Sequence, residues 1–292
     1  MSENRDSPWR AEIDDLLRGV AGAFLFGSPF LYTMEVWWKG NIASPPRMLF
    51  ALAVTYLTVL VVDRALGFRR RKSSDWSRAF ADSVEALALG LLISALSLAL
   101  LGIIGPNDGL KAMMGRIVME AIPFSIGVGL ANTFMTKSDE NPDKGDHKDG
   151  ADNSEWVNDS WRGTLADLGA TSLGAIIIAS SIAPTDEVQV ISSGLSHLKL
   201  LLLVAASMLL SYVIVFEANF GSQEARRNQR GIFQTPASET VISYLASLVV
   251  SLAMLWLFQL ISLDDPVDKW ISYTLVLGFP ATLGGAAGRL VI

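Results

Sequence analysis

The stretch from Phe80 to Ile104 reads FADSVEALALGLLISALSLALLGII, and its composition decides the fold class of the chain. It carries no charged residue after Glu85. A helix of about 20 apolar residues crosses the ~30 Å hydrocarbon core of a bilayer, and core helices of soluble proteins rarely contain so long an apolar run. Backbone groups in lipid must be hydrogen-bonded within the segment, so the run predicts a transmembrane helix rather than a strand.

Seven further apolar runs lie along the 292 residues, separated by charged or Pro- and Gly-rich segments. The chain is 51% hydrophobic and 18% charged, whereas a soluble domain carries roughly a quarter charged residues. We therefore expect an all-α membrane protein with about eight transmembrane helices. The predicted spans are approximately 19–38, 48–67, 80–104, 113–135, 163–183, 198–220, 241–263 and 270–292.

Lysine and arginine residues are distributed unevenly between the predicted connections. With the N-terminus in the cytoplasm, 17 of the 23 basic residues lie in segments on the cytoplasmic side and 6 on the other side. Cytoplasmic connections of membrane proteins carry such an excess of Lys and Arg. We expect a multi-pass protein with both termini in the cytoplasm.

The two halves of the chain resemble each other, although their identity is low. Polar and special residues agree at a constant offset over long stretches, which indicates an internal duplication. Chance similarity between apolar helices is the alternative explanation. The paired positions are 82–132 with 239–289, 14–19 with 158–163, Asp108 with Asp265, and Pro123 with Pro280.

The duplication predicts how the chain is divided. Four helices per repeat is an even number, so both repeats enter the membrane in the same direction, and a pseudo-twofold axis along the membrane normal is expected. The connection between the repeats is acidic and poor in apolar residues, so we expect it to be disordered. The parts are a cytoplasmic N-terminal segment (1–17), a first four-helix repeat (18–136), an acidic linker (137–161) and a second four-helix repeat (162–292).

The third helix of each half carries small residues at every fourth position, a pattern that lets helices approach closely in lipid. Because both halves have the pattern, we expect these two helices to pack at or near the pseudo-twofold axis. Ordinary close packing within each half is the alternative. The stripe residues are Ala86, Gly90 and Ser94 in the first half and Ser243, Ser247 and Ser251 in the second.

Carboxylates lie at corresponding cytoplasmic ends of the predicted helices. Asp82 and Glu239 begin the two stripes, and capping of a helix N-terminus is the alternative role for them. Asp63 and Glu217 lie near helix C-termini, and Glu85 is one position off the stripe. Together these residues predict an acidic vestibule, which would raise the local concentration of cations.

Glu120 is the deepest ionisable residue in the predicted spans. A charge at this depth is costly, and such a residue is by default a candidate for function. Arg116 lies four residues earlier, so an ion pair along the helix is the alternative explanation. The second half has Tyr273 and Leu277 at the corresponding positions, so this feature is confined to the first half.

Pro123 and Pro280 fall near the middle of the fourth and eighth predicted helices, and glycines follow each of them. Matched Pro and Gly interruptions in the two halves indicate a binding site near the membrane midplane, because a freed carbonyl can coordinate an ion. A proline kink whose backbone groups are satisfied by neighbouring helices is the alternative.

Signals for enzymatic chemistry are sparse. The chain has no cysteine, which excludes disulfides and thiolate metal sites, and its two histidines are His147 and His197. It contains no His-Glu-x-x-His pair, phosphate-binding loop or Gly-x-Ser-x-Gly motif. We expect no catalytic residue, no metal site, no cofactor and no nucleic-acid partner.

The segment 18–38 reads RGVAGAFLFGSPFLYTMEVWW. It resembles the N-terminal signature R-G-x-x-G-x-x-x-F-G-x-P-x-x-Y-T-M-E-x-W-W of a family of bacterial integral membrane proteins of unknown function. The resemblance implies a bacterial inner-membrane protein and brings no activity. Arg78-x-Phe80-x-Asp82 is similar to the Arg/Phe-Ser-Asp motif of a family of proton- and potassium-conducting channels, although Ala81 replaces the serine and the second half lacks the phenylalanine.

These features lead to one functional hypothesis and two alternatives. We expect a transporter or channel for a small cation, a proton or an alkali metal, along the interface between the repeats. The alternatives are a non-transporting sensor or assembly module and an intramembrane enzyme acting on lipid. The expected partners are the lipid bilayer and small cations, and a homo-oligomer is compatible with the sequence.

Overall fold

The computed structural model describes residues 8–66, 76–131, 153–218 and 235–290. These residues form helices, and no strand occurs among them. Seven of the helices are long and apolar enough to cross a membrane. The predicted all-helical membrane architecture is borne out, while the first of the predicted spans has a different form.

The described helices are divided between the two halves of the chain, with a 3-10 helix (η1) between α1 and α2 and a π-helix (η2) after α9. The first half contains α1 (Pro8–Gly27), η1 (Phe30–Tyr32), α2 (Met34–Ile42), α3 (Pro45–Leu66), α4 (Trp76–Leu100) and α5 (Leu110–Leu130). The second half contains α7 (Asn153–Ile182), α8 (Glu187–Gly194), α9 (His197–Tyr212), η2 (Val213–Glu217), α11 (Pro236–Leu257) and α12 (Val267–Leu290).

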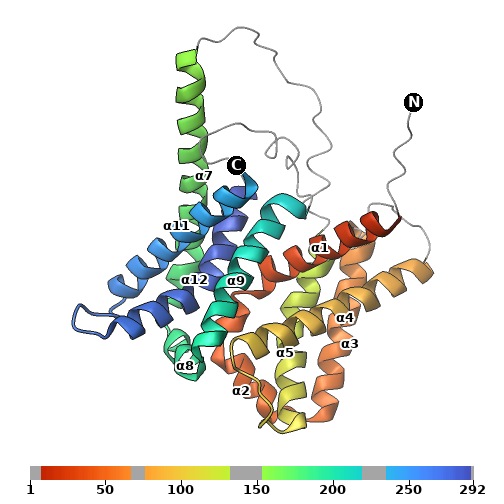
Figure 1. Ribbon diagram of the computed structural model, residues 1–292. Coiled ribbons are helices and arrows are strands. Elements are labelled where there is room, and N and C mark those ends of the chain that lie inside the picture. The colour runs from red at the N-terminus through yellow and green to blue at the C-terminus, as the bar shows by residue number, and fades with distance from the viewer. Residues whose placement is uncertain (1–7, 67–75, 132–152, 219–234, 291–292) are drawn as a thin grey trace, which may run out of the picture.

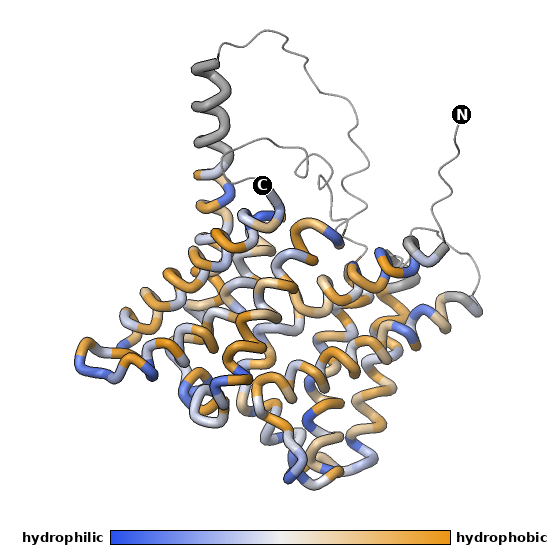
Figure 2. The backbone as a smooth tube through the Cα atoms, viewed as in Figure 1, coloured by the Kyte–Doolittle hydropathy of each residue, from blue (hydrophilic) through white to orange (hydrophobic). Residues whose placement is uncertain are grey.

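Successive long helices run in alternating directions. In the view of Figure 1, α1, α4, α7 and α11 run downward, whereas α3, α5, α9 and α12 run upward. The short helices α2 and α8 continue the downward course of α1 and α7. Figure 2 shows hydrophobic residues along the length of the helices and hydrophilic residues mainly at helix ends and in connections, as expected for helices in lipid.

The first predicted span, 19–38, is not a single helix. α1 ends at Gly27 and α2 begins at Met34, with η1 between them. Pro29 explains the interruption, because proline disfavours helical backbone at the preceding residue and has no N–H to donate. We call residues 28–33 the helix break.

The second half differs from the prediction at two places. α8 lies in a connection where no helix was predicted. α7 begins at Asn153, so the end of the predicted linker 137–161 is helical rather than disordered. The earlier part of that linker lies outside the described residues.

One helix is central in each half. α5 packs against α1, α2, α3 and α4, and α12 packs against α7, α8, α9 and α11. Glycines bring the backbones together: a Cβ on Gly22 would lie 2.5 Å from the carbonyl oxygen of Gly127, and one on Gly174 would overlap that of Gly284. Such close approach increases van der Waals contact, which drives helix association in lipid, where the hydrophobic effect does not act between helices.

The small-residue stripes serve packing within each half. Gly90 lies directly against α5, and the Ser94 hydroxyl donates to the carbonyl of Ile117 at 3.1 Å. The Ser247 hydroxyl lies 3.0 Å from where a Cβ on Gly285 of α12 would sit. The prediction that the two stripe helices pack together near an axis is wrong, because α4 and α11 lie on opposite sides of the molecule and pack on α5 and α12 (Figure 1).

The two halves meet mainly through α1. This helix contacts η2 and α12 of the second half, and α4 adds a smaller contact with α9. The Phe24 and Phe279 rings meet edge to face with centroids 6.2 Å apart, and such pairs contribute roughly 0.5–1.5 kcal/mol beyond their buried area. The broken first helix is therefore the main element of the interface.

The α4–α5 and α11–α12 connections share one backbone geometry, 157 positions apart. Gly102 and Gln259 both adopt positive φ, 71° and 62°. Ile103 and Leu260, the residues that follow, each donate an N–H to the carbonyl five residues earlier at 2.9 Å. This is the hydrogen bond of a Schellman motif, which closes a helix at a left-handed residue.

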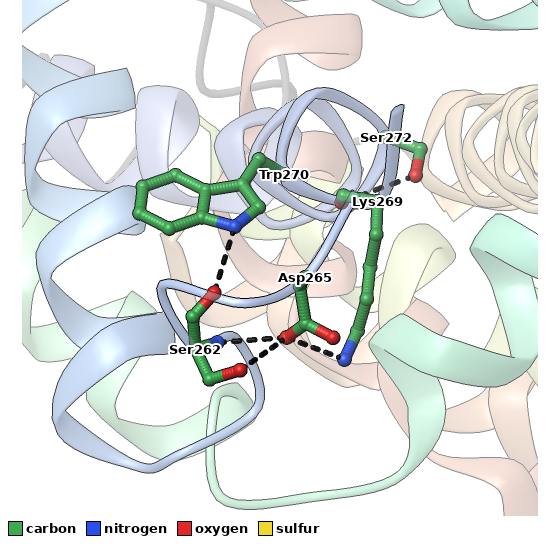
Figure 3. Close-up of polar contacts among 5 residues, drawn as sticks. All are labelled: Ser262, Asp265, Lys269, Trp270 and Ser272. Carbon is green, nitrogen blue, oxygen red and sulfur yellow. Dashed lines mark hydrogen bonds and ion pairs between the residues drawn. The ribbon is translucent and has the colours of Figure 1, made fainter. Parts of the chain in front are cut away.

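An aspartate completes each of these connections. Asp108 and Asp265 each accept the N–H three residues earlier, at 2.8 and 2.7 Å. A basic residue of the next helix then pairs with the aspartate: Arg116 at 3.3 Å in the first half and Lys269 at 2.9 Å in the second. Figure 3 shows the second of these clusters, in which Trp270 also donates a hydrogen bond to the backbone of the connection.

Candidate functional site

The helix break is fixed to the second half through a carbonyl group that a proline leaves free. The Tyr32 hydroxyl donates to the carbonyl oxygen of Val276 at 2.6 Å. Val276 precedes Pro280 by four residues, and proline has no N–H to donate to that carbonyl. An unpaired buried carbonyl is costly. Tyr32 therefore replaces the helical hydrogen bond that Pro280 removes.

Glu187 makes a second contact with the helix break from the second half. Its Oε1 accepts the N–H of Met34, the first residue of α2, at 3.3 Å. Figure 1 shows α2 and α8 side by side. A carboxylate is favourable at a helix N-terminus, where backbone N–H groups lack helical partners. Only 6% of Glu187 is exposed, and its Oε2 is buried without a hydrogen-bond partner among the described residues.

Glu120 lies on α5, the helix against which both α1 and α2 pack. The residue is fully buried, with 0% exposed, and neither carboxylate oxygen has a hydrogen-bond partner in the described part of the chain. On α5 it lies between two contacts with the broken helix: Gly115 packs against Gly40 of α2, and Phe124 packs against Gly27 of α1. Glu120 is therefore level with the helix break.

Arg116 does not neutralise Glu120. Its guanidinium donates to the carbonyl of Ile103, to Asp108 at 3.3 Å and to Asn41 at 3.4 Å, all toward the α4–α5 connection and α2. The alternative explanation of Glu120 as half of an ion pair along the helix is therefore wrong.

Trp37 brings an unused donor to the same level. Its indole N–H is buried and has no acceptor among the described residues. Gly40 packs against Gly115 and Arg116. From that contact, Trp37 lies one turn nearer the helix break on α2, and Glu120 lies about one turn nearer on α5. We call Glu120, Glu187, Trp37 and Tyr32 the break site.

A cavity of about 230 Å³ reaches the helix break at Ser28. Its walls come from α1, α7 and α12 and are mostly apolar side chains and glycines, among them Leu25, Ile178 and Gly284. The volume exceeds what a single water molecule needs. The described part of the chain therefore has open space beside the interrupted helix, between the two halves.

Glu239, which was predicted to attract cations, is already paired with a basic side chain of the protein. It forms an ion pair with Arg289 of α12, whose side chain is fully buried. The guanidinium also donates to the Ser243 hydroxyl at 3.1 Å and lies 5.5 Å from the centroid of the Phe216 ring. In the sequence Arg289 counts only as a basic residue near the cytoplasmic side, because its burial depends on the packing of η2 and α11 around it.

The other predicted carboxylates lie on three different elements. Asp82 and Glu85 are half-buried near the start of α4. Glu217 lies in η2 and accepts a hydrogen bond from the Tyr212 hydroxyl at 3.1 Å. Asp63 belongs to α3, but its side chain lies outside the described part of the chain. Since α4 and α11 do not pack together, Asp82 and Glu239 are not brought into one cluster.

Among the predicted candidates, Pro280 is linked to the helix break through the Val276 carbonyl, and Glu120 lies level with the break on α5. Glu187 was missed because the segment before it, Pro184-Thr185-Asp186, is typical of an exposed connection. A usable signal exists: Thr185-x-Glu187-Val188 has the same pattern as Thr33-x-Glu35-Val36, 152 positions earlier. The break site thus contains two buried carboxyl groups and one indole N–H donor without hydrogen-bond partners for Glu120, for Glu187 Oε2 or for the indole among the described residues.

Comparison with known proteins gives a family and no activity. No curated protein and no solved structure matches the chain. The model of the family described as "Putative integral membrane protein (DUF2391)" matches residues 15–292, which include all of the break site. With its seven apolar helices of membrane-spanning length, the chain belongs to this family of integral membrane proteins.

Proposed function

We propose that this protein moves a small cation across the membrane, as a transporter or channel, and that Glu120 binds the ion. The observation that carries the proposal is the complete burial of this carboxyl group in a membrane-spanning helix, with no hydrogen-bond partner for either oxygen among the described residues. Ionisable residues at such positions are costly and mark ion or proton pathways.

The interrupted helices support the same proposal. Discontinuous helices form ion and substrate sites in many transporters, because helix ends within the membrane present free backbone groups. α1 gives way to α2 at the helix break, level with Glu120, and α7 gives way to α8 between Ile182 and Glu187. Glu187 joins these two interruptions through its hydrogen bond to Met34.

We further propose that α1 and α2 together form the first of eight crossings, and that the halves are parallel tandem copies. The Schellman connections and their aspartates recur 157 positions apart. The α1–α5 contact of Gly22 with Gly127 has its counterpart in Gly174 with Gly284. In this comparison the first helices correspond at an offset of 152 positions, so the alignment of 14–19 with 158–163 is replaced.

The orientation follows from the basic residues. Figure 1 shows the start of α1 and the end of α12 toward the same side of the molecule. The excess of Lys and Arg in the connections on that side supports a cytoplasmic location for both termini. The resemblance of segment 18–38 supports a bacterial inner membrane.

In this proposal the remaining carboxylates have an accessory role. Asp82, Glu85, Asp63 and Glu217 would raise the cation concentration at the cytoplasmic mouth. Glu239 is set apart from them, since Arg289 already neutralises it.

The test is flux through purified protein in sealed liposomes. Uptake of radioactive sodium and rubidium and the internal pH are measured in parallel, with protein-free liposomes as the background. We expect at least one of these cations to move faster than the background, and Glu120→Gln to slow it about tenfold or more. Glu35→Gln, on an exposed glutamate of α2, is the matched control.

A second function, a non-transporting sensor or assembly module, is favoured by one observation. The cavity at the helix break is lined mostly by apolar residues and glycines rather than by polar groups. Background rates for all three ions with folded protein in the bilayer would contradict transport and favour this module.

A further inference from the structure

We infer that the ion handled at the break site is a proton, exchanged between Glu120 and Glu187, and not an alkali metal cation; the inference rests on the proposed function. The contact of Glu187 with Met34 uses only Oε1, so the second carboxylate oxygen of Glu187 has no role so far. Its Oε2 and both oxygens of Glu120 are the buried carboxylate atoms left without partners in the described residues.

The ligands at the break site do not suit an alkali cation. Such a cation replaces its water shell with several oxygen atoms, as in rings of backbone carbonyls. The Tyr32 hydroxyl and the Val276 carbonyl are already bonded to each other at 2.6 Å. Trp37 offers an N–H, which donates hydrogen bonds and cannot ligate a cation. The described residues also contain no group of three or more acidic or histidine side chains that could hold a metal ion.

A proton needs only what the site contains. The protonated residue of the pair releases its proton, and a carboxylate oxygen of the other residue accepts it, directly or through water. After the transfer the first residue is the carboxylate and the second is the protonated acid. The unused indole N–H of Trp37, level with Glu120, can donate to the carboxylate that forms. Exchange between the two residues would carry a proton from the first half of the chain to the second.

No basic side chain among the described residues forms an ion pair with Glu120 or Glu187. On α5, Arg116 is bonded to Asp108 and the backbone of the α4–α5 connection. On α1, Arg18 is paired with Asp15 at 2.7 Å. The other ionisable residues of α2, Glu35 and Lys39, are exposed, as is Asp186 immediately before α8. A buried carboxylate without a cation is costly, and binding a proton removes its charge.

The experiment uses the full chain in liposomes with an entrapped pH-sensitive dye, a potassium gradient and valinomycin to set the voltage. We expect voltage-driven proton flux in the wild type and a decrease of about a hundredfold in both Glu120→Gln and Glu187→Gln. Trp37→Phe, which keeps an aromatic side chain and removes the donor, should lower the rate less, and Glu35→Gln should leave it unchanged. Glutamine at 187 keeps an oxygen for the Met34 N–H, and melting temperatures of all variants confirm that they are folded.

The outcomes separate the inference from the proposed function. Flux of sodium or rubidium without proton flux would overturn the inference and leave cation transport intact. Proton flux that Glu187→Gln leaves at the wild-type rate would also overturn it, because the exchange needs both carboxyl groups. Background rates for every cation would overturn the proposed function itself.

Discussion

Gln259 occupies a backbone conformation that Gly102 occupies in the first half. Both residues end a helix at positive φ, 62° for Gln259 and 71° for Gly102. Only glycine adopts this region without a steric penalty, and the left-handed conformation costs other residues roughly 1–2 kcal/mol. The connection between α11 and α12 therefore carries a strain that the connection between α4 and α5 avoids.

This difference predicts opposite effects of two substitutions. Gln259→Gly should stabilise the protein by about 0.5–1 kcal/mol, and Gly102→Ala should destabilise it by about 1 kcal/mol. The measurement is the melting temperature of purified protein in detergent. Gly109→Ala is the control, since Gly109 has φ −64° and open space where a Cβ would lie. A lower melting temperature for Gln259→Gly would contradict the assigned strain.

Asp265 predicts a pH-dependent contribution to stability. The hydrogen bond from Lys269, and then that from the N–H of Ser262, lowers the pKa of the Asp265 carboxyl below its usual value. A lowered folded-state pKa stabilises the protein above the unfolded-state pKa of about 3.9, and this contribution is lost as the pH falls through the folded-state value. The difference in melting temperature between wild type and Asp265→Asn should be largest at neutral pH and shrink below about pH 4.

The matched control for this titration is Asp264→Asn, one position away on an exposed residue. It should show the wild-type dependence of melting temperature on pH. A difference between wild type and Asp265→Asn that stays constant from neutral to acid pH would show that the charge of Asp265 is not what stabilises the connection.

The buried charged residues differ in how far the sequence predicts them. Glu120 was predicted because a carboxyl group within an apolar run is conspicuous at any helical register. Glu187 and Arg289 were not, because each lies near the end of its helix, where charged residues are common, and only tertiary packing buries them. The alternative that Arg116 pairs with Glu120 was wrong because spacing along one helix does not account for Asp108 in the neighbouring connection.

At the scale of elements, the helix break depends on the bond between Tyr32 and Val276. Tyr32→Phe removes the donor and leaves the carbonyl freed by Pro280 buried without a partner. We expect a loss of about 1–3 kcal/mol in the free energy of unfolding, larger than for an exposed hydrogen bond. Tyr56→Phe, on a half-buried tyrosine of α3, is the control. Equal unfolding free energies for wild type and Tyr32→Phe would contradict the importance of this bond.

The long elements were predictable and the short ones were not. Apolar runs near 20 residues identify membrane-spanning helices because lipid forces each backbone group to pair within its segment. The interruption at Pro29 was hidden because the residues around it, from Phe24 to Tyr32, are apolar enough to continue the run. α8 has eight residues, and a helix of that length is marginal without the packing that the rest of the chain supplies.

At the scale of the whole molecule, the absence of cysteine makes the proposed orientation directly testable. Glu12→Cys places a thiol at the exposed start of α1, and Asp264→Cys places one in the exposed α11–α12 connection. In sealed right-side-out vesicles, a membrane-impermeant maleimide should label the Asp264→Cys variant and should label the Glu12→Cys variant only after permeabilisation. Labelling of both variants in sealed vesicles would contradict the proposed orientation.

The arrangement of the halves shows where a sequence pattern stops being informative. Stripes of small residues on α4 and α11 correctly indicate close packing, but the pattern does not identify the partner helix. The partners are α5 and α12 within each half, and the interface between the halves is formed by α1 instead. The side on which two copies of a bundle meet depends on complementary shape, which a single sequence does not display.

The hydrogen bond from Tyr32 to Val276 also bears on how the chain is assembled during synthesis. While only the first half has been synthesised, the Tyr32 hydroxyl lacks the Val276 carbonyl as an acceptor. In the second half alone, this carbonyl would lack the Tyr32 hydroxyl as a donor. Each half thus supplies the hydrogen-bond partner that the other half needs in the bilayer. The bond can therefore form only after α12, the last helix to be synthesised, has reached the first half.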